Sequence, residues 1–231
     1  MRKQVAVIGL GRFGTSVALT LHDAGNEVLA IDIDEKRVQA ISSKITHAVQ
    51  ADATDEAVLT ELGIGEFQTV VVAMGSAIES SVLCTILLRK LGVPYVIARA
   101  DHDLHGSILE RIGANRVVYP EHEMGRRVAH GVELPGVQDY MPLVKGYGIS
   151  KLMAHKYLVG STLVQLGFGP SGKAEIAVLL IQRGEDVLIA PDMGEKVEVG
   201  DVLILSGRDD ALERQLSEVR KQHPEGDGET A

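Results

Sequence analysis

The chain has 231 residues, of which 45% are hydrophobic, a formal net charge of −9 and a pI near 5.4. The acidic balance and the aromatic content of 3%, with no Trp, argue against nucleic-acid binding, which needs a basic surface and often stacking rings. The single cysteine, Cys84, excludes an internal disulfide framework and a cysteine-rich zinc site, and no apolar run approaches the ~20 residues of a membrane-spanning helix.

From residue 4 to about residue 118, short β-branched runs alternate with helical patterns. We expect helices at 15–24, 35–42 and 78–91, and strands at 4–8, 27–31, 47–50, 69–73, 95–98 and 116–118. The strands are nearly continuous apolar runs, which is typical of strands buried on both faces. This part of the chain therefore predicts an α/β fold, a doubly wound parallel (Rossmann-like) sheet of six strands.

A further helix is expected at 121–133, where Met124, Val128 and Val132 form one apolar stripe at four-residue spacing. Such a stripe must pack on something, and a helix lying on its own sheet is at least as good an interpretation as a subunit interface. The Leu-Pro-Gly sequence at 134–136 ends this helix, because proline cannot continue it. We therefore predict a first domain over residues 1–134.

Beyond residue 134 the pattern changes to strands separated by turns. We expect a short helix at 161–166, a longer one at 209–220, a glycine-rich loop at 167–172, and strands at 137–144, 150–155, 174–182, 186–189 and 201–205. These elements predict a second, smaller α+β domain over residues 135–219. Residues 220–231 are polar and rich in Gly and Glu, which predicts a disordered tail.

The first strand runs directly into a Gly-x-Gly-x-x-Gly motif made by Gly9, Gly11 and Gly14. Gly9 would make the tight turn, Gly11 would let phosphate oxygens approach the backbone, and Gly14 would let the helix pack closely on the strand. The start of the following helix favours an anion. Taken alone the motif is a weak signal, because glycine-rich turns are common.

Acidic residues follow the next two strands. Asp32 lies at the end of the second strand, where this fold places an acid that accepts hydrogen bonds from ribose hydroxyls and disfavours a 2′-phosphate. Asp34 is expected to cap the next helix. Asp52, at the end of the third strand, could accept a hydrogen bond from an adenine amine or form only an Asx turn, and the two interpretations are about even.

Two arginines lie at the same edge of the predicted sheet, Arg12 inside the glycine loop and Arg99 after the fifth strand. A dinucleotide pyrophosphate is usually held by backbone amides, whereas two guanidiniums suit extra phosphate charge. The pattern favours a nucleoside di- or triphosphate, although either arginine could instead pair with a surface carboxylate. Glu121 could hold a divalent cation between phosphates, or be the acidic first turn of its helix.

The predicted nucleotide-binding residues come from the glycine loop, the ends of the following strands and the starts of the following helices. They are Gly9, Gly11, Arg12, Phe13, Gly14, Asp32, Asp34, Lys36, Asp52, Ala53, Thr54, Ala73, Met74, Gly75, Ser76, Glu79 and Arg99, with Glu121 as the metal candidate. A dehydrogenase would also need an acid/base pair, and His102, His105 and Lys156 form no recognisable one. The sequence therefore predicts binding and no catalysis.

Four motifs, at 7–14, 30–34, 51–54 and 119–125, resemble the amino-terminal RCK (KTN, TrkA-N) domain. Residues 158–163 and 199–205 resemble the RCK carboxy-terminal domain, so the resemblance covers about residues 4–217. Arg-Phe-Gly in the loop, and Pro-Glu before Met-Gly, are similar to the cytosolic regulatory subunits of Ktr-type potassium uptake systems.

This resemblance implies a homo-oligomer, a dimer of RCK domains within a commonly octameric ring, that binds ATP or ADP. It implies a membrane partner, a potassium-translocating subunit of KtrB/TrkH type, and a cytoplasmic location, peripheral on the inner face of the membrane. By the same resemblance Asp32 takes the ribose, Arg12 reaches a terminal phosphate, and Glu121 holds Mg or another cation near the γ-phosphates.

The resemblance also leaves other ligands open. Asp52 stands where some members have an uncharged residue, so NAD or NADH, as in Trk-type relatives, stays an alternative, with an NAD-dependent oxidoreductase less favoured. Some relatives bind cyclic di-AMP through the carboxy-terminal domain, but the loop at 167–172 is unusually glycine-rich. We therefore assign no residues to that ligand.

Overall fold

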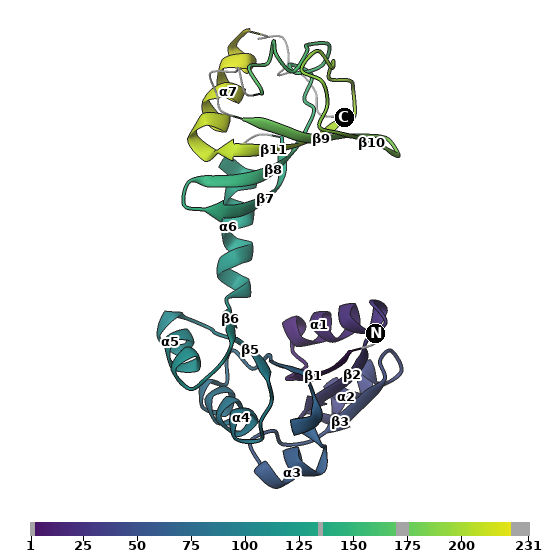
Figure 1. Cartoon of the computed structure of the whole chain (residues 1–231), viewed down its shortest axis with the longest axis vertical. Coiled ribbons are helices and arrows are strands. Elements are labelled where there is room, and N and C mark those ends of the chain that lie inside the picture. Colours follow the sequence, from purple (N-terminus) through teal and green to yellow (C-terminus); the bar gives the residue numbers. More distant parts are fainter. Residues whose placement is uncertain (1–2, 134–135, 170–175, 223–231) are drawn as a thin grey trace. The chain divides into compact units, whose positions relative to one another are not determined.

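The computed structural model describes residues 3–133, 136–169 and 176–222 (Figure 1). The chain divides into two compact units between His122 and Glu123. The boundary predicted after residue 134 lies near the opposite end of the connecting helix α6 (Pro120–Glu133), and it stays a prediction. The tail expected from residue 220 falls mostly outside the described residues, as do parts of the expected loop at 167–172 and the start of the strand expected at 174.

The first unit contains a parallel sheet with the strand order β3-β2-β1-β4-β5-β6. Its strands are β1 (Gln4–Ile8), β2 (Glu27–Asp32), β3 (His47–Gln50), β4 (Thr69–Val72), β5 (Tyr95–Arg99) and β6 (Arg116–Val118). The predicted six-stranded Rossmann-like sheet is confirmed. The strand order reverses between β1 and β4, and ligands of such sheets bind at the carboxyl ends of the strands beside that point.

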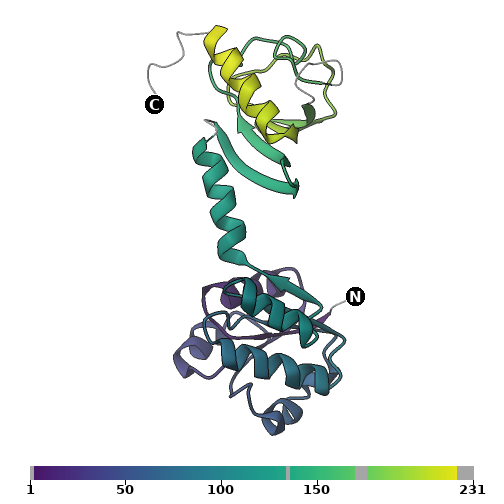
Figure 2. The same cartoon turned by 90° about the vertical axis from the view of Figure 1, so that its left-hand side faces the viewer.

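Helices cover both faces of this sheet (Figure 2). They are α1 (Arg12–Asp23), α2 (Glu35–Ser42), α3 (Glu56–Glu61), α4 (Ile78–Lys90) and α5 (Asp103–Arg111), with a 3-10 turn η1 (Ile64–Glu66). In β1, Val5 and Val7 pack with α1 and α2, whereas Ala6 and Ile8 pack in the core that includes α3, α4 and α5. Successive side chains thus enter opposite cores, which explains the continuous apolar runs.

The second unit contains an antiparallel sheet with the order β10-β9-β11-β8-β7. Its strands are β7 (Val137–Val144), β8 (Tyr147–Met153), β9 (Ala177–Arg183), β10 (Asp186–Ile189) and β11 (Val202–Arg208), and the helix α7 (Asp209–Gln222) follows. Leu212, Leu216 and Val219 of α7 enter the core formed with this sheet. The α+β prediction is confirmed, although β8 begins at Tyr147 and β11 ends at Arg208, because these two residues pair across the sheet.

The short helix predicted at 161–166 is wrong. The backbone of Thr162 forms an isolated antiparallel bridge with Lys196, and the amides of Leu163 and Val164 donate to the carbonyls of Glu195 and Met193. The Val197 amide donates to the Ser161 carbonyl, which the first helical hydrogen bond would need, and the Gln165 amide donates to the Thr162 hydroxyl instead. The chain therefore makes only hydrogen-bonded turns here. No helix within the described ranges combines the length and the apolar character that a membrane span requires.

Candidate functional site

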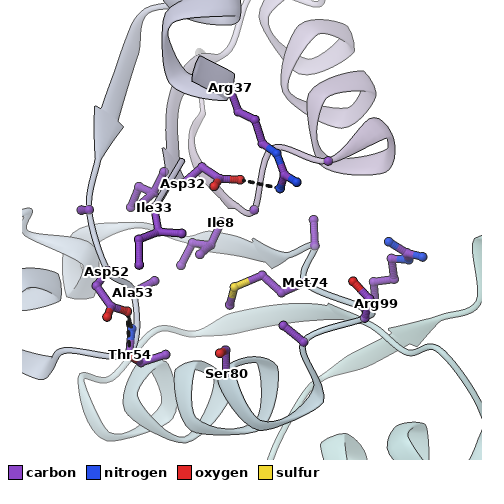
Figure 3. A pocket seen from close by; sticks show the side chains of 18 residues that line it. Ile8, Asp32, Ile33, Arg37, Asp52, Ala53, Thr54, Met74, Ser80 and Arg99 are labelled. Carbon is purple, nitrogen blue, oxygen red and sulfur yellow. Dashed lines mark hydrogen bonds and ion pairs between the residues drawn. The ribbon is translucent and has the colours of Figure 1, made fainter. Parts of the chain in front are cut away.

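A cavity of about 270 Å³, the inner cavity, lies at the carboxyl ends of β1, β2, β3 and β4 (Figure 3). Asp32 and Arg37 lie on one wall, Ser80 of α4 lies on the opposite wall, and Met74 lies between them. The remaining lining residues are mostly small or apolar, and they are Ile8, Gly9, Gly11, Ile31, Ile33, Ala51, Asp52, Ala53, Thr54, Ala73, Gly75, Ser76, Ala77 and Arg99.

The surroundings of the three loop glycines differ. Gly9 has a φ of +95°, and a Cβ there would also lie 2.8 Å from Met74 Cγ. A Cβ on Gly14 would overlap the carbonyl oxygen of Gly9, so this glycine allows α1 to approach the loop. A Cβ on Gly11 would meet nothing within 4 Å. The backbone at Gly11 is therefore open to an approaching ligand.

Helix α1 begins at Arg12, and its first turn is suited to an anion. Gly11, at the N-cap, supplies no capping side chain, and the first turn has no acidic residue. The amide groups at a helix start and the helix dipole both favour negative charge there. Arg12 is exposed, and it forms no ion pair with any residue that the structure describes. A cation at this position is disfavoured by the dipole, so an anion would satisfy both groups.

The carboxylate of Asp32 is buried, with 6% of the residue exposed. Its Oδ2 accepts a hydrogen bond from the Leu10 amide at 2.5 Å, and its Oδ1 accepts one from the Asp34 amide at 2.8 Å. Asp32 thus links the end of β2 to the glycine loop after β1. Asp34 caps α2 as predicted, accepting from the Lys36 amide at 2.9 Å.

Asp52 both lines the inner cavity and forms the Asx turn considered from the sequence. Its Oδ1 accepts from the Thr54 hydroxyl at 2.6 Å and from the Thr54 amide at 2.9 Å. These two hydrogen bonds hold the pKa of Asp52 below its ordinary value, so the side chain is an anion at neutral pH. A role toward adenine stays a prediction.

A second hollow, the outer hollow, is more open and has a volume of about 1170 Å³. It shares four lining residues with the inner cavity, Gly11, Arg37, Ser76 and Arg99, and its other lining residues are Leu10, Arg12, Phe13, Thr15, Ser16, Leu19 and Glu121. Three arginines and one carboxylate therefore line the outer hollow, in a chain whose net charge is −9.

Arg99 lines both hollows, and its side chain is fixed by neighbouring residues. Its Nη2 lies 2.7 Å from Glu121 Oε1, and its side chain is 17% exposed. Its guanidinium lies against Gly75, where a Cβ would come within 2.8 Å of the Cζ and Nε atoms. The buried Nε has no hydrogen-bond partner among the described residues. The Arg99 side chain lines both hollows, so its positive charge would favour a phosphate there.

Most predicted binding residues line one or both hollows. Four do not, and they are Gly14, Asp34, Lys36 and Glu79. The sequence interpretation missed Arg37 and Ser80, although each lies in the first turn of a helix that follows a strand ending at the site. His102 and His105 line neither hollow, and the His102 Nδ1 atom accepts from the His105 amide at the start of α5.

The donor set fits a nucleotide better than a metal held by this chain alone. No group of three His, Cys, Asp or Glu side chains within the described ranges is arranged to hold a metal ion. Glu121 contacts Arg99 instead, so a cation at Glu121 would need further ligands from phosphates or from another subunit. Metal binding at Glu121 stays a prediction.

A family model described as the TrkA-N domain matches residues 5–120. The chain belongs to the TrkA-N domain family. Ktr system potassium uptake protein C of Bacillus subtilis (strain 168) is 40% identical to this TrkA-N protein, over 90% of this chain and 93% of the relative. Ktr system potassium uptake protein A of the same organism is 38% identical, over 92% of this chain and 95% of the relative. The resemblance drawn from the motifs is confirmed.

Solved structures show the same fold at low sequence identity. The GsuK channel bound to NAD has a TM-score of 0.66 and 16% identity, and the match covers 94% of this chain and 40% of that chain. At this identity the likeness concerns the fold alone. The Ktr relatives of this TrkA-N protein are named as potassium uptake proteins and not as enzymes, in agreement with the missing acid/base pair.

Proposed function

We propose that this TrkA-N protein is the nucleotide-binding regulatory subunit of a Ktr-type potassium uptake system. ATP or ADP bound at the inner cavity and outer hollow would control a membrane potassium-translocating subunit of KtrB/TrkH type from the cytoplasmic side. The similarity to Ktr proteins over nine-tenths of the chain supports the potassium system. The geometry of the two hollows supports the nucleotide.

The observation that carries the proposal is the group of arginines in the outer hollow. The pyrophosphate of a dinucleotide can be held by the amides of the loop and of the α1 start. Arg12, which has no ion pair among the described residues, and Arg99 both line the outer hollow and add positive charge beyond that need. Guanidiniums in excess of the backbone amides suit the greater phosphate charge of ATP or ADP.

A nucleotide placed along the two hollows meets groups suited to each of its parts. Adenosine would lie in the inner cavity with its ribose at Asp32 and its adenine toward Asp52. The phosphates would pass the open backbone of Gly11 into the outer hollow, where Arg12 would reach the terminal phosphate. Glu121, 61% exposed, would hold a cation there once a phosphate takes its place beside Arg99.

Control of a membrane partner requires an assembly with two shapes, because a ligand shifts an equilibrium only through differential affinity. Met124, Val128 and Val132 are 54%, 59% and 78% exposed, so the apolar stripe of α6 is available to a second copy of the chain. We propose a ring of copies in which ATP favours the conducting shape and ADP the closed one.

Titration calorimetry with ATP and ADP on the wild type and on Arg12→Ala tests the nucleotide role. We expect Arg12→Ala to weaken ATP about tenfold or more and to affect ADP less, because the guanidinium would contact the γ-phosphate. Arg111→Ala, which removes an equal charge from the end of α5 and lines neither hollow, is the matched control. Equal losses for ATP and ADP in Arg12→Ala would refute the γ-phosphate role.

NAD or NADH is the alternative ligand. GsuK has been solved with NAD in one structure and with ADP in another, so the fold accommodates either class. Asp32 suits the ribose of both. The same titrations extended to NADH separate them, because NADH binding tighter than both ATP and ADP would favour the dinucleotide. Cyclic di-AMP in the second unit stays a prediction without assigned residues.

A further inference from the structure

We infer that Arg37 is a specificity-determining residue that exchanges the Asp32 carboxylate for the 5′-phosphate chain of the bound nucleotide. The inference rests on the proposed nucleotide site and adds a third guanidinium to it, from a helix that the sequence interpretation left out except for Lys36. It predicts that the site selects phosphorylated nucleosides over nucleosides.

The contact between Arg37 and Asp32 is geometrically weak. The Arg37 Nη1 atom lies 3.4 Å from Asp32 Oδ2, which is a long hydrogen bond. The Arg37 Nε atom lies 3.6 Å from Asp34 Oδ2, and this second distance is too long for a hydrogen bond. The Arg37 side chain is 54% exposed, whereas the Asp32 side chain is only 5% exposed, so one end of this ion pair is open to water and the other is buried. The long distances and the exposed guanidinium let Arg37 move to another acceptor, provided that the buried Asp32 carboxylate gains a new donor in its place.

Ribose binding at Asp32 competes with this contact. A carboxylate offers about four acceptor positions, and the amides of Leu10 and Asp34 already use one on each oxygen. Arg37 uses a third position, on Oδ2. A ribose diol donates through two hydroxyl groups, so it needs the position that Arg37 holds. A nucleoside that binds at Asp32 must therefore displace the Arg37 guanidinium.

The outer hollow gives the displaced guanidinium its new partner. Arg37 is one of the four residues that line both hollows, together with Gly11, Ser76 and Arg99, and Figure 3 shows it reaching from α2 toward Asp32 at the cavity wall. The phosphates of a nucleotide with its ribose at Asp32 would pass Gly11. Adenosine removes Arg37 from Asp32 and offers nothing in return, whereas AMP, ADP and ATP each offer a phosphate.

Titration calorimetry of the full chain with adenosine, 5′-AMP, ADP, ATP and 2′-AMP tests the exchange. In Arg37→Ala we expect 5′-AMP, ADP and ATP to bind about tenfold more weakly or worse, because a charge-assisted hydrogen bond is lost. Adenosine should bind as tightly as in the wild type or more tightly, since nothing has to be displaced. Arg37→Lys should recover part of the loss, and Arg111→Ala should match the wild type.

Three results would overturn the inference. Equal weakening of adenosine and the 5′-nucleotides would mean that Arg37 only shapes Asp32, and no change for any ligand would mean that it does not contact the phosphates. A loss confined to 2′-AMP would place the guanidinium at the 2′ side of the ribose. In each case the Arg12→Ala titrations still decide the proposed function separately, whereas a wild type that binds no adenine nucleotide would overturn both.

Discussion

Replacing Asp32 by Asn is expected to destabilise the glycine loop as well as to weaken adenosine binding. The two carboxylate oxygens of Asp32 accept from two different backbone amides, those of Leu10 and Asp34, in a residue that is 6% exposed. Asparagine has one acceptor oxygen and one NH₂ donor. One of the two amides would then face an NH₂ donor and lose its acceptor.

The size of the effect follows from these contacts. A hydrogen bond to a charged group contributes about 1.5–3 kcal/mol, and one such bond is lost while the other loses its charge. Removing a buried carboxylate also removes its desolvation cost, which offsets part of that loss. We therefore expect the free energy of unfolding to fall by about 2 kcal/mol. Adenosine should bind more weakly, because one ribose hydroxyl loses its acceptor.

Urea denaturation followed by circular dichroism measures the stability change, and calorimetry measures adenosine binding. Asp52→Asn is the matched control, since both hydrogen bonds of that exposed side chain fall on Oδ1, which an asparagine carbonyl replaces. Its unfolding free energy should stay within about 0.5 kcal/mol of the wild type. An Asp32→Asn protein as stable as the wild type, or an equal loss in Asp52→Asn, would refute the reasoning.

Two further predictions concern the glycine loop and the second unit. Gly14→Ala should unfold at a lower temperature and lose nucleotide binding, because its Cβ would overlap the Gly9 carbonyl, whereas Gly11→Ala should melt like the wild type. Arg183→Met should lower the free energy of unfolding by about 3–5 kcal/mol, measured by urea denaturation at neutral pH. The reason is that Asp201 is fully buried and accepts hydrogen bonds from both the Nε and the Nη2 of Arg183. Burial opposes ionisation of Asp201, but hydrogen bonds from Arg183 and the Glu198 amide outweigh it and lower its pKa. The stability that the ionised Asp201 contributes is present above its pKa in the unfolded chain and is lost as the pH falls through its pKa in the folded protein. The unfolding free energies of the wild type and Arg183→Met should therefore converge in acid.

The sequence by itself determined the type and order of most elements. Val5, Ala6, Val7 and Ile8 form a continuous apolar run, which is typical of a strand buried on both faces, and the two cores of the first unit take alternate members of it. The glycine spacing and Asp32 located the binding edge, because their separation reflects one strand-helix-strand unit. These signals depend only on residues that are close together in the sequence, so they can be interpreted without knowing how the rest of the chain folds.

Only the tertiary structure decided which side chains share the site. The segment at 161–166 has a capping residue and helical spacing, yet the Val197 amide takes the Ser161 carbonyl that the first helical hydrogen bond would need, and no local pattern shows that competition. The sequence predicts Arg99 at the binding edge because it follows the fifth strand, but it does not show that Arg37 of α2 lines the same hollows. The strand order β3-β2-β1-β4-β5-β6 brings the two arginines together. Long-range strand pairing sets the proximity of Arg37 to Arg99, so residue spacing along the chain could not predict it.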